Sequence, residues 1–114
     1  MNHAYLNGRL WINDPDTLMV RASDTELTPD ETGLWARAVS MAGGSLLLSD
    51  RLPALPPDRL ALARGVFAAH GAVRDLRPLD RWERAFPEQW LATRDGQPVH
   101  ARFDFTGHRA IAAP

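Results

Sequence analysis

Residues 43–50 read Gly-Gly-Ser-Leu-Leu-Leu-Ser-Asp, and this stretch decides the fold class. Its three leucines at 46–48 follow one another without alternating polar residues, which is typical of a strand covered on both faces, as in parallel sheets, and the predicted strand spans residues 45–48. The two glycines before them are strong helix terminators. The stretch therefore predicts that a helix ends at residue 42 and that a buried parallel strand follows directly.

The helix that leads into this strand has a complete start signal. Residues 27–31 read Leu-Thr-Pro-Asp-Glu. Thr28 is placed as the N-cap, Pro29 occupies the first helical position and Glu31 completes a capping box. Apolar residues then recur at helical spacing along one face, namely Leu34, Trp35, Ala38, Val39 and Ala42. The pattern predicts a helix that runs to Ala42.

An earlier strand and a second helix extend the pattern. Residues 9–13, Arg-Leu-Trp-Ile-Asn, predict a short buried strand that ends in a turn at residues 14–16. Residues 57–69 predict a helix whose buried face holds Leu60, Ala63, Val66 and Phe67. Two strands joined through a helix are expected to lie parallel, with a right-handed crossover.

The last third of the chain has a different pattern. Prolines interrupt residues 75–90, and four apolar side chains there are expected to anchor onto a larger structure: Leu79, Trp82, Phe86 and Trp90. Residues 94–96 predict a turn. Val99, Ala101, Phe103 and Phe105 then alternate with polar residues, which predicts a half-buried antiparallel strand.

These elements do not form a closed structure by themselves. A parallel sheet of two strands leaves open edges and is not stable alone, and the strand near Phe103 lacks partners. We therefore expect part of a larger α/β barrel, followed by the start of a β domain. The division falls between residues 1–72 and 73–114. The alternative is a small non-enzymatic α/β module that self-associates or docks on a partner.

Composition excludes several function classes. The 114 residues contain no cysteine and no lysine. Their 13 arginines and 14 acidic residues give a net charge of −1. Thiolate sites, Schiff-base lysines and P-loops are excluded, and nucleic acid is not an expected partner. The histidines have no metal-ligand spacing, so neither a metal nor a cofactor is expected. No apolar run is long enough for a membrane span, and residues 1–5 lack signal-peptide features, which favours a cytoplasmic protein if Met1 is the true start.

Carboxylates follow both predicted strands, where functional residues of parallel α/β proteins gather. Asp14 and Asp16 follow the first strand and Asp50 follows the second. The connection from Asp14 to Thr28 is long for a strand-to-helix loop. A functional turn and a turn held by its own side-chain hydrogen bonds are equally compatible with residues 13–16. Trp11 is a further candidate, because aromatic side chains often line sugar sites.

The order of these motifs resembles that of melibiase-type α-galactosidases, which are retaining glycoside hydrolases. The likeness covers residues 10–18, 27–31 and 43–52, and continues more loosely to Phe105. It implies the last two β/α units of a (β/α)8 barrel, followed by the start of an antiparallel β-sandwich. Residues 9–13 and 45–48 would be the seventh and eighth strands, and the N-terminal part of the barrel would be missing.

The resemblance also implies a function. In this family one Asp attacks the anomeric carbon and a second acts as acid and base. The nucleophile lies in a Lys-x-Asp context that this chain lacks, so both catalytic residues would lie outside it and the chain alone would be inactive. What remains is a wall of the α-galactoside site: Asp16 would contact the sugar, Asp14 would orient the turn or neighbouring charges, and Asp50 would lie at the rim after the last strand. Trp11 and Thr17 are further candidates for contact with the substrate. Thr17 replaces the Cys or Met common in the family, which leaves the preferred sugar open.

Overall fold

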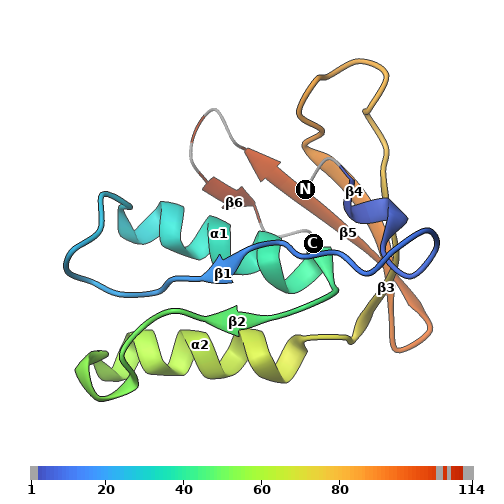
Figure 1. Cartoon of the computed structure of the whole chain (residues 1–114). Coiled ribbons are helices and arrows are strands. Elements are labelled where there is room, and N and C mark those ends of the chain that lie inside the picture. Colours follow the sequence, from blue (N-terminus) through green and yellow to red (C-terminus); the bar gives the residue numbers. More distant parts are fainter. Residues whose placement is uncertain (1–2, 105–106, 108, 112–114) are drawn as a thin grey trace.

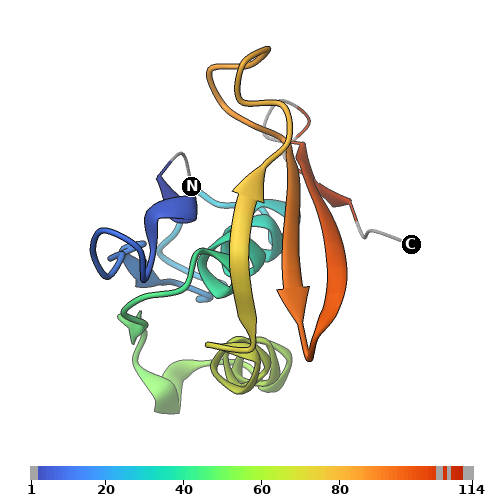
Figure 2. The same ribbon diagram turned by 90° about the vertical axis from the view of Figure 1, so that its right-hand side faces the viewer.

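The computed structural model describes residues 3–104, 107 and 109–111, and shows a mixed α/β fold (Figure 1). Helix α1 (Pro29–Ala42) lies between a two-stranded parallel sheet and a four-stranded antiparallel sheet (Figure 2). Helix α2 (Pro57–Ala69) packs beside α1. Helix α1 supplies side chains to a hydrophobic core on each side, so it is the central element of the molecule.

The predicted boundaries of α1 are confirmed. The backbone N–H of Glu31 donates to Thr28 Oγ1 at 3.3 Å, and the N–H of Thr28 donates to Glu31 Oε2 at 2.7 Å. This capping box satisfies two N–H groups that have no partner within the helix. The helix ends at Gly43 and Gly44, whose φ angles of 64° and 90° suit glycine alone.

A parallel pair of strands joined through α1 is present, but its first strand lies at residues 17–18 and not at the predicted residues 9–13. Strand β1 (Thr17–Leu18) pairs in parallel with β2 (Leu47–Leu48), and α2 follows β2 after a 3-10 turn, η2 (Leu52–Ala54). Beyond the strands the buried carboxylate of Asp50 accepts the backbone N–H of Val20 at 2.6 Å and pairs with Arg21 Nε at 2.7 Å. Asp50 therefore holds the continuations of both strands together.

The strand predicted at residues 9–13 is wrong. Arg9 and Leu10 form a turn behind a 3-10 helix, η1 (Ala4–Leu6), and Trp11 makes only an isolated bridge to Asn7. Local hydrogen bonds to Leu6 and Trp11 carbonyls satisfy this backbone, so the apolar run does not need a neighbouring strand. In consequence residues 14–16 precede β1 and lie at its N-terminal end, not after the first strand as expected.

The antiparallel sheet contains four strands in sequence order: β3 (Val73–Pro78), β4 (Gln89–Arg94), β5 (Gln97–Asp104) and β6 (Arg109–Ile111). The expectation that the strand near Phe103 lacks partners is therefore wrong. The predicted turn is a two-residue hairpin loop at Asp95 and Gly96, both with positive φ. Ala101 and Phe103 are buried as predicted, whereas Phe105 lies outside the described residues.

Several predicted burials differ from the structure. Trp90 is fully buried, but Leu79, Trp82 and Phe86 are exposed on the loop that joins β3 and β4. Phe67 is exposed on α2, and Leu47 leaves one face of β2 open to solvent. The expected division after residue 72 falls at the start of β3, whose strand contacts α1.

Gly44 provides a test of this architecture. A Cβ at residue 44 would overlap the carbonyl group of Asn13, and the positive φ adds backbone strain. Gly44→Ala is expected to lower the free energy of unfolding by at least about 2 kcal/mol, measured by urea unfolding. Gly33→Ala is the control, because a Cβ there meets no atom within 4 Å. It should raise stability by about 0.5–1 kcal/mol, and equal effects of the two variants would contradict the packing described.

Candidate functional site

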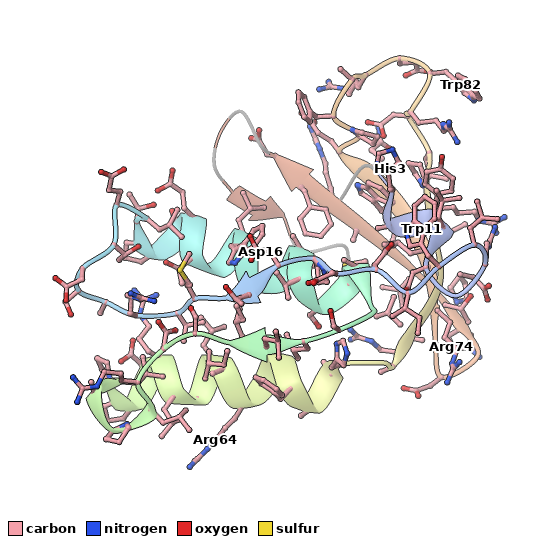
Figure 3. The ribbon with its side chains drawn as sticks, in the orientation of Figure 1. His3, Trp11, Asp16, Arg64, Arg74 and Trp82 are labelled. Carbon is pink, nitrogen blue, oxygen red and sulfur yellow. The ribbon has the colours of Figure 1, made fainter. Side chains whose placement is uncertain are left out.

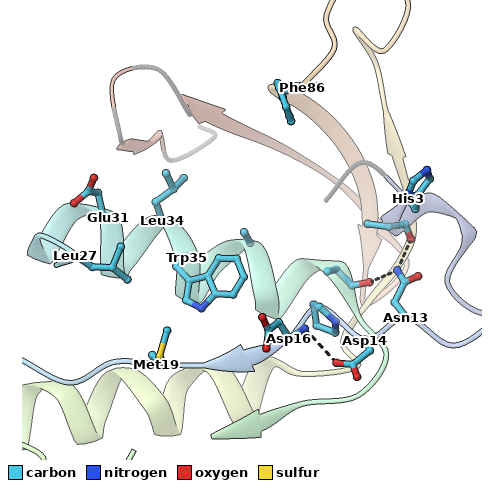
Figure 4. A pocket seen from close by; sticks show the side chains of 14 residues that line it. His3, Asn13, Asp14, Asp16, Met19, Leu27, Glu31, Leu34, Trp35 and Phe86 are labelled. Carbon is cyan, nitrogen blue, oxygen red and sulfur yellow. Dashed lines mark hydrogen bonds between the residues drawn. The ribbon is translucent and has the colours of Figure 1, made fainter. Parts of the chain in front are cut away.

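A cleft of about 950 Å³ opens between the N-terminal segment, α1 and the loop of residues 79–88, which we call the β3–β4 loop (Figure 4). This volume lies within the range of small-molecule sites, roughly 300–1,000 Å³. Aliphatic side chains of α1 line it together with polar and aromatic groups. These groups are the carboxylates of Asp14, Asp16 and Glu31 and the rings of His3, Trp35 and Phe86.

Asn13 fixes where the acidic residues stand. Its buried Nδ2 donates to the carbonyl oxygens of Ala4 and Ala42, each at 3.3 Å. Its own carbonyl oxygen accepts the backbone N–H of Ser45 at 2.9 Å. The N-terminal segment, the end of α1 and the approach to β2 therefore converge on one side chain and its backbone. The sequence predicts Asn13 only as the end of a strand, and its neighbours in the chain carry no signal for this positioning role.

Asp14 and Asp16 lie together on the turn of residues 13–16, which we call the acidic turn. The N–H of Asp16 donates to Asp14 Oδ1 at 3.2 Å, and the N–H of Thr17 donates to Asp16 Oδ1 at 2.6 Å. Among the described residues no donor reaches Oδ2 of either carboxylate. The turn is thus held by its own side-chain hydrogen bonds, which was one of the two interpretations of residues 13–16. It also presents two carboxylates at the cleft, so both interpretations remain open.

The backbone of Asp16 is strained. Its φ of 77° lies in the left-handed region, which a residue with a side chain rarely adopts. Strain of this kind is concentrated at functional sites, because the surrounding structure must hold it in place. Asp24, Asp75 and Asp95 also have positive φ and lie outside the cleft, so this backbone marks a tight turn and does not by itself assign a function to Asp16.

Trp11 and Thr17 do not join the two carboxylates. The Trp11 ring is about half exposed outside the cleft, and its Nε1 donates to Asn13 Oδ1 at 2.8 Å (Figure 3). Thr17 belongs to β1, and its carbonyl oxygen accepts Trp35 Nε1 at 3.3 Å. Both residues therefore support the acidic turn and α1 in this structure.

Of the lining residues only Asp14 and Asp16 were predicted as site residues, and three of the others illustrate why they were missed. Glu31 and Trp35 carried signals for a helix cap and a buried helix face, and these signals concealed that they also reach the cleft. Phe86 comes from the distant β3–β4 loop. An exposed aromatic residue between prolines was its only signal, and that signal suggested an anchor.

The arrangement suits binding better than bond cleavage. A retaining glycosidase needs two carboxyl groups about 5–5.5 Å apart that flank the anomeric carbon. Asp14 and Asp16 come from one short turn and so approach a ligand from the same side. The third carboxylate, Glu31, already accepts the N–H of Thr28. Carboxylate oxygens on one wall are suited to accept hydrogen bonds from the hydroxyl groups of a ligand.

No group of three or more histidine, aspartate or glutamate side chains in the described part of the chain is placed to hold a metal ion. No helix within the described residues has the length and apolar character to cross a membrane.

The strain at Asp16 can be measured by paired substitutions. Asp16→Gly and Asp16→Ala both remove the carboxylate, so their difference reports the backbone alone. We expect the glycine variant to be more stable by about 1 kcal/mol in urea unfolding, because glycine adopts positive φ without a Cβ clash. The same pair at Asp14, where φ is not positive, is the control. There alanine should be the more stable residue, and the same order at both positions would contradict the strain.

Comparisons with known proteins add no family to this description. No protein-family model matches the chain, and no curated protein matches it.

Proposed function

We propose that this chain is part of a retaining glycoside hydrolase that acts on terminal α-galactosides, and that it contributes one wall of the sugar site. The observation that supports this most directly is the acidic turn, which presents Asp14 and Asp16 at a cleft of ligand size. The same turn carries the motif that resembles the melibiase-type family. Sequence motif and cleft therefore coincide at one place in the molecule.

The order of elements is consistent with this proposal, whereas the place of the acidic turn is not: the turn precedes β1, and the sites of (β/α)8 barrels lie at the carboxyl ends of their strands. Two strand–helix units with parallel strands, β1–α1 and β2–α2, precede an antiparallel sheet. In the proposed enzyme they are the last two units of a (β/α)8 barrel and the first strands of a β-sandwich. Among the described residues β1 and β2 pair only with each other, so each has an edge at which a further barrel strand would pair.

The proposed division of labour follows from the chemistry of the turn. The nucleophile and the acid/base of the double displacement belong to other strands of the barrel, and this chain binds the sugar. A hydrogen bond from a sugar hydroxyl to a carboxylate contributes about 1.5–3 kcal/mol. Asp16 makes these contacts, and Asp14 holds Asp16 through the 3.2 Å hydrogen bond to its backbone.

Binding without turnover is the expected behaviour of the isolated chain. Calorimetric titration with methyl α-galactoside should show binding, and Asp16→Asn should weaken it about ten- to a hundredfold through loss of a charged acceptor. Nitrophenyl α-galactoside should not be hydrolysed.

Asp58→Asn is the matched control. This carboxylate is exposed on α2 and lies outside the cleft, so the substitution should leave the affinity unchanged. Turnover by the pure chain would refute the absence of a catalytic pair. A wild-type chain that binds no galactoside would refute the proposed function itself.

A docking module is the second candidate, and exposed apolar side chains favour it. Leu10 and Ile12 in the N-terminal segment are 71% and 78% exposed, and Trp82 projects from the β3–β4 loop with 87% exposed (Figure 3). Apolar surface of this kind often marks a protein contact. Such a module should sediment as a defined oligomer that Ile12→Ser and Trp82→Ser together dissociate, and it should bind no sugar. A monomer at all concentrations would argue against self-association.

A further inference from the structure

A groove of about 460 Å³ lies between α1, α2 and the β4–β5 hairpin, and we call it the helix groove. The two helices run side by side and contact each other (Figure 1). The groove uses a different face of α1 from the cleft beside the acidic turn, and the two share no lining residue. The proposed function therefore leaves this part of the molecule without a role.

Two arginines bring positive charge to the helix groove. Arg37 comes from α1 and is half-buried, and Arg94 comes from the end of β4 and is exposed. Among the described residues neither guanidinium group makes an ion pair or a hydrogen bond, whereas those of Arg21 and Arg84 each pair with a carboxylate. No aspartate or glutamate is found among the described residues that line the groove. Its two positive charges are therefore not balanced by the described part of the chain.

Ser40 adds a hydrogen-bond donor without a partner. The residue is 7% exposed and lines the helix groove, and its hydroxyl makes no hydrogen bond to any described residue. By contrast, the hydroxyl of Thr32 in the same helix donates to the Thr28 carbonyl oxygen at 2.9 Å. Buried polar groups normally have a partner, because a missing hydrogen bond is unfavourable. A ligand in the groove would supply the partner that Ser40 lacks.

Two glycines keep the helix groove open at a cost to the helices. Gly33 in α1 and Gly65 in α2 both line it, and a Cβ at either residue would meet no atom within 4 Å. Alanine would therefore fit at both positions, and it favours a helix more than glycine does. Packing within the described part of the chain does not account for these glycines, whereas the space that they leave for a ligand does.

The chemistry of the helix groove indicates a phosphate group. Two guanidinium groups and a hydroxyl donate hydrogen bonds, so the ligand must supply acceptor oxygens and negative charge. A carboxylate carries one charge, whereas a phosphate monoester carries about 1.5–2 at neutral pH and has three acceptor oxygens. The planar guanidinium group of arginine matches the geometry of phosphate. The rest of the wall is apolar and includes Ala36, Met41, Leu62, Val66 and Val99.

We propose that the helix groove binds a small phosphate monoester with an apolar body. The phosphate accepts hydrogen bonds from Arg37, Arg94 and Ser40, and the apolar body packs on the aliphatic wall. The volume of the groove lies in the range of small-molecule sites. The cleft beside the acidic turn presents Asp14 and Asp16 and would repel such an anion, so the two sites take different ligands. This inference does not rest on the proposed function, so either can hold without the other.

Three probes test the ligand class: phenyl phosphate, inorganic phosphate and benzoate. Each is titrated by calorimetry into the whole chain in a buffer free of phosphate and sulfate. Phenyl phosphate should bind most tightly. Inorganic phosphate lacks the apolar body and should bind about tenfold more weakly. Benzoate keeps the ring but carries a single charge, and it should also bind about tenfold more weakly than phenyl phosphate.

Substitutions test the site itself. Arg37→Gln and Arg94→Gln should each weaken the binding of phenyl phosphate about tenfold, and Ser40→Ala should weaken it about threefold. Gly65→Leu places a side chain in the groove and should abolish binding. Arg64→Gln is the control, because this arginine is exposed on α2, does not line the groove and points away from α1 (Figure 3). It removes the same charge and should keep the wild-type affinity.

Urea unfolding separates loss of the site from loss of the fold. Ser40→Ala removes a hydroxyl without a partner and Gly65→Leu improves helix propensity, so neither should lower the urea concentration at the midpoint. A wild-type chain that binds none of the three probes would overturn the inference. So would an unchanged affinity in the double variant Arg37→Gln/Arg94→Gln, which would place the phosphate elsewhere. Benzoate that binds as tightly as phenyl phosphate would overturn the assignment of a phosphate ligand.

Discussion

The buried amide of Asn13 is the contact on which the rest of the structure depends. It joins the carbonyl of Ala4 to that of Ala42, and its own carbonyl group receives Ser45. The approach is so close that residue 44 must be glycine. An unpaired buried carbonyl costs about 1–3 kcal/mol, so these groups hold the N-terminal segment against the end of α1. Without this junction the acidic turn would have no fixed place above the helix.

Features encoded by neighbouring residues could be predicted from the sequence. The capping box at Thr28 and Glu31, the glycines that end α1 and the Asp95–Gly96 hairpin each depend on a few adjacent side chains. Strand β3 could not be recognised in the same way. Asp75 has a positive φ, and the pairing of β3 with β4 shifts in register between Arg74 and Arg77. Leu76 is therefore the only buried side chain of β3, and the strand shows no alternation of apolar and polar residues. The first strand was misplaced because the backbone hydrogen bonds of an apolar run can be made by local turns as well as by a neighbouring strand.

The candidate site shows the same limit. Asp14 and Asp16 were predicted because they stand in one short motif, and both reach the cleft. Trp11 and Thr17 were placed beside them by adjacency in the chain, but a turn sends neighbouring side chains in different directions. Phe86 reaches the cleft from the far end of the sequence through the packing of the antiparallel sheet on α1. A single sequence carries no signal for a tertiary contact between segments that lie so far apart in the chain.

The short length of β1 and β2 has a consequence for how the chain behaves among other chains. An exposed strand edge is a template for unwanted pairing, and its danger grows with the number of backbone groups that it offers in register. Each of these strands contains two residues, and the Asp50–Arg21 pair closes the ladder directly after them. The edges therefore offer too few hydrogen bonds to capture a foreign strand, while a matched strand held in place by covalent connection could still add to them.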